Sequence, residues 1–293
     1  MPLTQARPPT RPGAEATTLP ASTYHRLNAL CPTLNAGIMA AGSLLAPGWI
    51  EGVAIPANTQ ALNAFLDAEA ARIEARHGHT ARPDVVATKA LHGYLWAVCL
   101  LMSGPWYLQR RVPQVRPADI RVELATGRLG IVPGEFVCLP DDPASNLPGV
   151  RTLPHEEALR AELRRTVADH AQALLTALGP RLRRGPRALW GMVGDDLVSG
   201  IWHLGRALGQ EEQAARQATE LLPGPLAPFP GGADFRKLTD AAGGSQLTRT
   251  RLGCCLHYTI RPAEACATCP RVCDAERLRM AAASSDNEPV LQH

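Results

Sequence analysis

The chain has 293 residues, of which 45% are hydrophobic and 19% are charged, and this composition excludes a chain that is disordered throughout. Its 30 basic and 27 acidic residues leave a net charge of only +3, which argues against a nucleic-acid-binding protein. The 25 glycines and 26 prolines predict helices that are separated by many rigid connections.

A proline-rich start and a helix are the first predicted elements. Residues 1–21 hold five prolines and little apolar periodicity, which predicts a disordered tail. Asn58 or Thr59 can cap a helix that ends near Gly78, because apolar residues recur on one face between them.

The next helix is strongly apolar. Residues 90–108 contain no Lys, Arg, Asp or Glu, which reaches the length of a marginal membrane span. Gly104-Pro105 predicts an earlier stop, so we expect a helix over 84–102. We interpret it as a buried core helix and predict no transmembrane segment.

Strands and three more helices follow. Residues 119–139 are rich in β-branched side chains and broken by two turns, which predicts two or three short antiparallel strands. Apolar residues then step by three or four, which predicts a helix over 154–178 that Gly179-Pro180 ends. A further helical pair is expected over 186–208 and 211–222.

Together these elements predict an α+β, predominantly helical fold. The helical body carries a short antiparallel strand section and precedes a small C-terminal segment. We predict four parts, which are a tail at 1–21, a mostly helical substrate- or partner-binding body at 22–235, a cysteine-rich segment at 236–281 and a tail at 282–293.

Five of the eight cysteines fall within 20 consecutive residues near the C-terminus. The N-terminus shows no apolar stretch typical of an export signal, so we expect the protein in the reducing cytoplasm, with or without loose contact with the inner membrane face. In that compartment a cysteine cluster indicates metal ligands rather than disulfides. Cys31, Cys99 and Cys138 lie apart in apolar surroundings and are predicted to be buried.

The spacing of the cluster is Cys254-Cys255, ten residues, Cys266, two residues, Cys269. A tight turn brings the sulfurs of Cys-x-x-Cys together on one metal site, and four thiolates are the commonest ligands of an iron-sulfur cluster. Structural zinc sites usually have spaced pairs, so adjacent cysteines fit zinc poorly and need a bend or a two-iron core. Cys273 is extra and is interpreted as a free thiol, with a spare or substitute ligand as the alternative.

This segment resembles the FhuF-type ferric siderophore reductases. The resemblance covers about 30 residues clearly and rests on Arg251, Cys254, Cys255, Leu256, Tyr258, Cys266, Thr268, Cys269 and Pro270. Residues 189–208 resemble a Trp-Gly-containing helix of the family more weakly, with Met192 where the family commonly has Asn. The resemblance implies that the four cysteines hold a 2Fe-2S cluster.

The resemblance also implies an oxidoreductase acting on metal ions. A ferric siderophore, which we expect to be of the hydroxamate type, would take one electron from the cluster and release Fe2+ into the cytosol. Four residues flank the adjacent cysteines and are candidates either to bind the substrate or to hydrogen-bond the cluster sulfurs, namely Arg249, Arg251, His257 and Tyr258. The alternative is that the arginines are solvated and Tyr258 belongs to the core. Asp195-Asp196 are interpreted either as a helix-start device or as polar pocket groups.

The sequence contains no GxGxxG, phosphate-loop or Gly-x-Ser-x-Gly motif. Electrons are therefore expected from a partner such as a ferredoxin, a flavodoxin or a flavin reductase, or from free reduced flavin. The basic connector, defined as Arg181, Arg183, Arg184 and Arg187, is either a docking site for an acidic donor or a solvated turn. Two alternatives stay open, namely a non-catalytic iron-sulfur sensor or electron-transfer protein, and a zinc-stabilised structural module.

Overall fold

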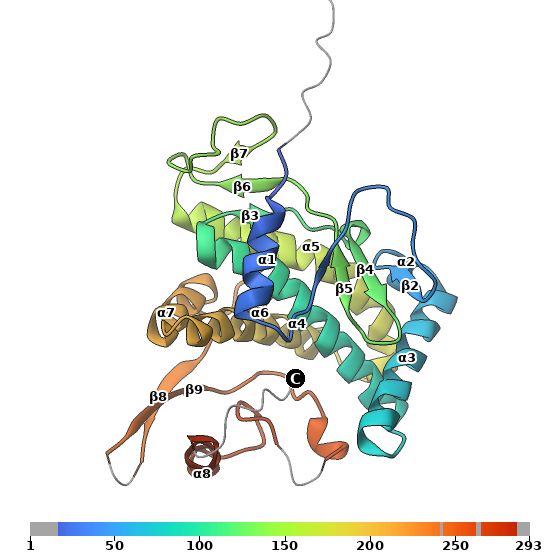
Figure 1. Cartoon of the computed structure of the whole chain (residues 1–293). Coiled ribbons are helices and arrows are strands. Elements are labelled where there is room, and N and C mark those ends of the chain that lie inside the picture. The colour runs from blue at the N-terminus through green and yellow to red at the C-terminus, as the bar shows by residue number, and fades with distance from the viewer. Residues whose placement is uncertain (1–16, 241–242, 262–264, 286–293) are drawn as a thin grey trace, which may run out of the picture.

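The computed structural model describes residues 17–240, 243–261 and 265–285, and its fold is α+β and predominantly helical, as predicted (Figure 1). The helices are α1 (Ala21–Leu30), α2 (Ala54–Ala57), α3 (Thr59–His77), α4 (Pro83–Gln109), α5 (Glu156–Leu182), α6 (Pro186–Ala207), α7 (Glu211–Leu221) and α8 (Asp274–Ser285). The strands are β1 (Gly37–Ile38), β2 (Trp49–Glu51), β3 (Val112–Pro113), β4 (Ile120–Glu123), β5 (Leu129–Ile131), β6 (Phe136–Cys138), β7 (Arg151–Thr152), β8 (Phe235–Thr239) and β9 (Ser245–Arg249).

Helix α4 forms the centre of the body, where it packs against α5 and α6 and also contacts α1 and α3. Among the described residues it is the one helix long and apolar enough to span a membrane, yet 89% of its apolar window is buried inside the protein. The apolar side chains of α4 are therefore covered by other helices, which confirms the interpretation as a core helix.

Two helices run through Gly-Pro pairs at which we predicted them to end. Helix α4 continues through Pro105 to Gln109, and α5 continues through Pro180 to Leu182. Each helix ends at an arginine with positive φ, Arg110 or Arg183. A proline removes one backbone hydrogen bond, and burial of the following turn, which includes Trp106 in α4, outweighs that loss.

Helix α3 confirms its predicted ends. The side chain of Asn58 accepts hydrogen bonds from the backbone N–H groups of Gln60 and Ala61, and Gly78 ends the helix at φ 72°. The helices α6 and α7 also lie within one residue of their predicted ranges. All three have local signals at their ends, which explains the agreement.

The strands form three small sheets. Antiparallel β4 and β5 confirm the predicted pair and form a sheet of order β1-β5-β4-β2, in which β1 runs parallel to β5. Strand β6 belongs to a different sheet, of order β3-β6-β7, and β8 and β9 form an antiparallel hairpin. The strands β1, β2, β3 and β7 have two or three residues each, too few to produce a detectable alternation.

The ends of the body differ from the predicted tails. Residues 17–21 pack on the body, since Thr17 donates to the carbonyl of Pro148 and Leu19 is buried. The rest of the predicted first tail lies outside the described residues. Helix α8 extends to Ser285, into the predicted second tail, whose remainder also lies outside them.

The C-terminal segment lies below the body in Figure 1. The β8–β9 hairpin leads the chain away from α7, and the chain then returns past α6 and α4 before it reaches α8 (Figure 1). The cysteine cluster is thus brought against the middle of the two central helices.

Candidate iron-sulfur site

The Cys-x-x-Cys pair lies in the tight turn that its spacing predicts. The backbone N–H of Cys269 donates to the carbonyl of Cys266 over 2.9 Å. Arg277, which is buried on α8, donates to the carbonyl of Cys269 over 2.7 Å and to that of Val272 over 3.0 Å. Helix α8 therefore holds this turn through a single guanidinium group.

The adjacent cysteines lie at a bend in the chain. Leu256 follows them with φ 60°, a left-handed conformation that reverses the chain and lets its carbonyl accept from Thr259. Cys255 is buried, as is Cys269, while Cys254 and Cys266 are half-buried. The backbone N–H of Arg251 donates to the carbonyl of Thr268 over 3.0 Å, so the two cysteine pairs lie side by side.

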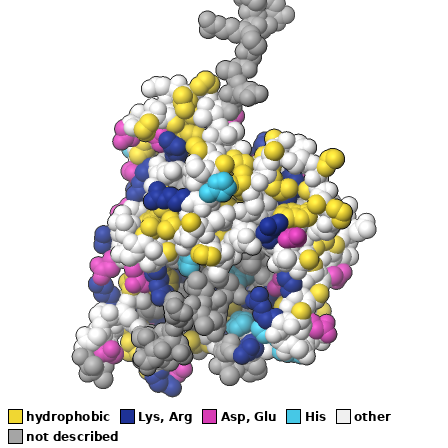
Figure 2. Space-filling view, in the orientation of Figure 1, with side chains coloured by type: hydrophobic (Ala, Val, Ile, Leu, Met, Phe, Trp, Pro, Cys, Tyr) yellow, Lys and Arg dark blue, Asp and Glu magenta, His cyan; other side chains and the backbone are white. Residues whose placement is uncertain are grey.

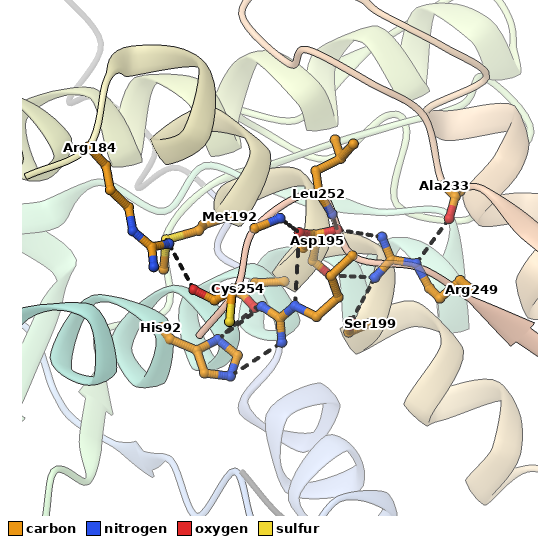
Figure 3. Close-up of polar contacts among 12 residues, drawn as sticks. His92, Arg184, Met192, Asp195, Ser199, Ala233, Arg249, Leu252 and Cys254 are labelled. Carbon is orange, nitrogen blue, oxygen red and sulfur yellow. Dashed lines mark hydrogen bonds and ion pairs between the residues drawn. The ribbon is translucent and has the colours of Figure 1, made fainter. Parts of the chain in front are cut away.

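Asp195 on α6 holds the backbone that leads into Cys254 (Figure 3). Its two carboxylate oxygens accept from the backbone N–H groups of Leu252, at 3.1 Å, and Gly253, at 2.8 Å. Asp195 is fully buried, and its charge is balanced by Arg249, whose Nη2 lies 2.6 Å from Oδ1. The N–H of Gly253, which is buried, would otherwise be unsatisfied inside the protein.

Arg249 is itself fully buried and fully engaged. Besides Asp195 it donates to the carbonyl of Ala233 over 2.9 Å and to the hydroxyl of Ser199 over 3.2 Å (Figure 3). A guanidinium group enclosed in this way has a structural role. Arg249 links the end of β9 to α6.

Asp196, the next residue on α6, forms a second buried pair. Its Oδ1 lies 2.7 Å from Nη2 of Arg251 and 2.8 Å from Nδ1 of His92 on α4. Burial lowers the pKa of Arg251, but the charges of Asp196 and Asp195 outweigh it and raise that pKa above its usual value. Arg251 therefore carries a fixed positive charge close to Cys255 and Cys266.

Glycine and methionine allow the segment to lie close to α6. A Cβ on Gly253 would come within 2.7 Å of the Met192 side chain, and a Cβ on Gly191 within 3.2 Å of Leu252. Arg184, at the start of the α5–α6 connection, donates to the carbonyl of Cys254 over 2.7 Å (Figure 3). Met192 therefore packs against the cysteine segment.

The surroundings lower the pKa of Cys255 and raise the pKa values of Cys254 and Cys266. The pKa of Cys255 is lowered, first by a hydrogen bond from Cys266 and then by the positive charges of His92 and Lys89 and the backbone N–H of His257. The pKa of Cys266 is raised by the same shared hydrogen bond, because two adjacent thiolates repel each other. Burial raises the pKa of Cys254, and the backbone N–H of Leu256 and the charge of Arg184 offset only part of that rise. Deprotonated thiols are the form that binds iron.

The donor set fits a two-iron cluster. All four cysteines are free thiols, and Cys255 and Cys266 are close enough to share a hydrogen bond. A 2Fe-2S cluster distributes four thiolates over two irons.

The structure separates the four predicted substrate-binding residues. Arg249 and Arg251 are buried and hold the segment to α6, so neither faces open space. Tyr258 is half-buried, with the guanidinium of Arg271 4.5 Å from its ring centroid. Of these four described residues, His257 is the one that lines the cavity beside the cysteine segment.

That cavity, of about 720 Å3, lies beside the cysteine segment. Its walls come from α3, α4, the β4–β5 hairpin, residues 33–35 and the chain after Cys255. His92 and His257 belong both to the cavity wall and to the surroundings of Cys255. A ligand in the cavity would therefore lie next to the cysteine site.

Several residues at this site were missed by sequence reasoning. They are His92 and Lys89 on α4, which are far from the cysteines in sequence, and Arg277 on α8, eight residues after Cys269. Arg184 was predicted only as part of the basic connector, and the structure brings it to the carbonyl of Cys254. Asp195 and Asp196 were predicted to be either a helix-start device or polar pocket groups. Helix α6 begins at Pro186, so both residues lie buried in its middle rather than at its start. Carboxylates on a helix face that is otherwise apolar were the available signal.

A helical α+β body with a docked four-cysteine segment defines this chain as an iron-sulfur protein. A sequence model of the FhuF 2Fe-2S C-terminal domain matches residues 251–271, and the cysteines at 254, 255, 266 and 269 fit the Cys-Cys-x10-Cys-x2-Cys pattern. The segment is thus an FhuF-type 2Fe-2S domain. No curated protein matches the chain.

Proposed function

We propose that this protein is a cytoplasmic ferric siderophore reductase whose cluster ligands are Cys254, Cys255, Cys266 and Cys269. The observation that carries the proposal is that the FhuF-type 2Fe-2S segment forms part of the wall of a cavity of about 720 Å3. A cavity of this size accommodates a compact small-molecule complex. We propose a siderophore that binds iron through hydroxamate groups.

A bound 2Fe-2S cluster supplies one electron at a time. Other residues of the chain position the cysteine ligands, since Asp195 fixes the backbone before Cys254 and Arg277 fixes the Cys266–Cys269 turn. Arg251 places a buried positive charge beside the thiolates. The ferric ion of the substrate gains one electron, and the resulting Fe2+ is held less strongly by hard oxygen ligands and is released.

The electron donor is proposed to be an acidic redox protein of the ferredoxin or flavodoxin type, or a flavin reductase. The basic connector supports this proposal because Arg183 and Arg187 are exposed, while Arg184 between them touches the carbonyl of Cys254. Arg181 is exposed as well and bonds Asn63. A positive surface next to the cluster would attract an acidic partner.

The test is anaerobic purification, with iron and sulfide counted per chain and the EPR spectrum recorded after dithionite reduction. We expect about two irons and two sulfides, and fast reoxidation of the reduced protein by a ferric hydroxamate. Cys255→Ser and Cys269→Ser should lower the iron content or alter the EPR signal. Cys273→Ser is the matched control, because Cys273 is exposed and lies outside the pattern, and it should leave both unchanged.

Two outcomes would contradict the proposal. A colourless protein with about one zinc per chain would indicate the structural module instead. A normal cluster that no ferric chelate reoxidises would indicate a sensor or an electron-transfer protein without this substrate.

A further inference from the structure

The cavity next to the cysteine segment is strongly basic. Among the described residues that line it are five Lys or Arg side chains and a single carboxylate, that of Glu69. The basic residues are Arg72, Arg76, Lys89, Arg128 and Arg261. In Figure 2, Lys and Arg side chains are spread over the visible face, and some of them lie next to His side chains at its lower right.

Two of these charges are already balanced. Arg72 pairs with Glu69 over 2.6 Å and also donates to the carbonyl of Leu124, so it ties α3 to the end of β4. Arg128 lies 3.4 Å from Glu123 and stacks over the ring of Trp49. Glu69 and Glu123 are thereby used, and neither can neutralise the other cations.

Arg76 and Lys89 are not paired with a carboxylate of the described residues, although Lys89 is near enough to Cys255 to lower the pKa of that thiol. Neither forms a hydrogen bond or an ion pair with any residue that the structure describes. Arg76 continues the cavity-lining face of α3, four residues after Arg72, and Lys89 lies on the face of α4 that also carries His92 and Trp96. Arg76 is exposed and Lys89 half-buried, so one lies toward the solvent and the other deeper.

The electrostatic effect of these charges is visible at His77, another lining residue. Its pKa is lowered, first by burial and then by the positive charges of His257, Arg261 and Arg76. Unbalanced cations around one cavity repel each other, and an anionic ligand relieves that repulsion. The deeper wall is aromatic, with Phe65, Tyr94 and Trp96, so it can contact an apolar ligand body.

We infer that this cavity selects ferric chelates with a net negative charge, in particular hydroxamate chelates that also bear carboxylate groups, and that Arg76 and Lys89 bind those carboxylates. The inference rests on the proposed function and names its substrate class. Three hydroxamates neutralise Fe3+ and leave a complex without charge. Only additional anionic groups give the chelate a charge that the cavity can recognise.

Binding can be measured without electron transfer by replacing Fe3+ with redox-inert Ga3+. The probes are the tris-acetohydroxamate complex, which is neutral, and the tris-succinomonohydroxamate complex, which has the same metal-binding groups and three added carboxylates. Calorimetry on the intact, cluster-containing protein should give a Kd at least about tenfold lower for the anionic complex, with an advantage that shrinks as salt is added.

The double variant Arg76→Gln/Lys89→Gln should weaken binding of the anionic complex by about tenfold and change binding of the neutral complex less than about twofold. Arg26→Gln is the matched control, because Arg26 is exposed on α1 and outside the cavity lining. Iron content and circular dichroism verify that each variant is folded. Equal binding of both complexes, no binding of either, or no effect of the double variant would overturn the inference.

Reoxidation of the dithionite-reduced protein by the corresponding Fe3+ complexes separates this inference from the proposed function. If both ferric complexes oxidise the protein equally and the double variant behaves as wild type, the reductase proposal stands and the charge selection fails. If the anionic gallium complex binds selectively but neither ferric complex oxidises the protein, the selection stands and the reductase proposal fails.

Discussion

Single buried charges hold the cysteine segment to the helical body. Asp195 accepts two backbone N–H groups and a guanidinium, and Asp196 accepts from Arg251 and His92, all inside the protein. A complete buried ion pair adds little to the free energy of unfolding, but removing one partner leaves the other charge buried without compensation. These residues therefore position the ligands rather than react.

Asp195→Asn tests this role at nearly constant shape. The amide lacks the charge that balances Arg249, and its NH2 group faces a backbone donor. We expect the free energy of unfolding to fall by about 3 kcal/mol and the iron content per chain to drop. Chemical denaturation and iron analysis measure the two effects.

Asp169→Asn is the control for that experiment, since Asp169 is exposed and pairs with Arg165 on the surface. We expect a change below about 1 kcal/mol and normal iron content. If Asp195→Asn behaved like this control, the assignment of Asp195 as a positioning residue would be wrong.

Helix α3 forms one wall of the cavity. Its start depends on Asn58, whose side chain accepts from two N–H groups that no helical carbonyl can reach. Its inner face carries both Arg72 and Arg76. A stable first turn therefore helps to keep these guanidinium groups aligned with α4.

Asn58→Ala removes the cap, and we expect the free energy of unfolding to fall by about 1 kcal/mol. Asn58→Asp keeps an accepting oxygen and adds a negative charge at the helix N-terminus, so it should retain wild-type stability. Thermal or urea unfolding of the two variants provides the measurement. Equal losses in both would show that the cap does not stabilise α3.

At the scale of the whole molecule, a buried histidine links two of the long core helices, α4 and α5. His170 on α5 bonds the carbonyl of Val115 over 3.0 Å through Nδ1 and the hydroxyl of Tyr94 on α4 over 2.9 Å through Nε2. Burial lowers the pKa of His170 to about 4. The folded protein therefore keeps this histidine neutral where the unfolded chain, with a pKa of about 6.5, takes up a proton.

This difference makes stability depend on pH. Because the unfolded state binds the extra proton, the free energy of unfolding falls as pH decreases from about 6.5 toward 4. Between pH 7.5 and 5.5 we expect His170 to contribute a loss of about 1 kcal/mol. His170→Gln, which has no titrating group, should show a correspondingly smaller decline in urea unfolding over that range. Parallel declines in the two proteins would contradict this assignment.

The sequence by itself determined the cysteine spacing, the ends of α3, α6 and α7, and the apolar face of α5 from Leu159 to Leu178. These features depend on neighbours within a few residues, where capping, turns and helical period act. The adjacent cysteines also predicted either a local bend or a two-iron core, and the chain bends at Leu256.

Only the tertiary structure decided that α4 and α5 pass through Gly-Pro pairs, that Asp195 and Arg277 hold the cysteine turns, and that Arg76 and Lys89 share one cavity beside them. Arg249 and Arg251 changed from candidate substrate contacts to buried partners of α6 for the same reason. Burial and ion pairing are set by groups far apart in sequence, so their energies are absent from any local pattern.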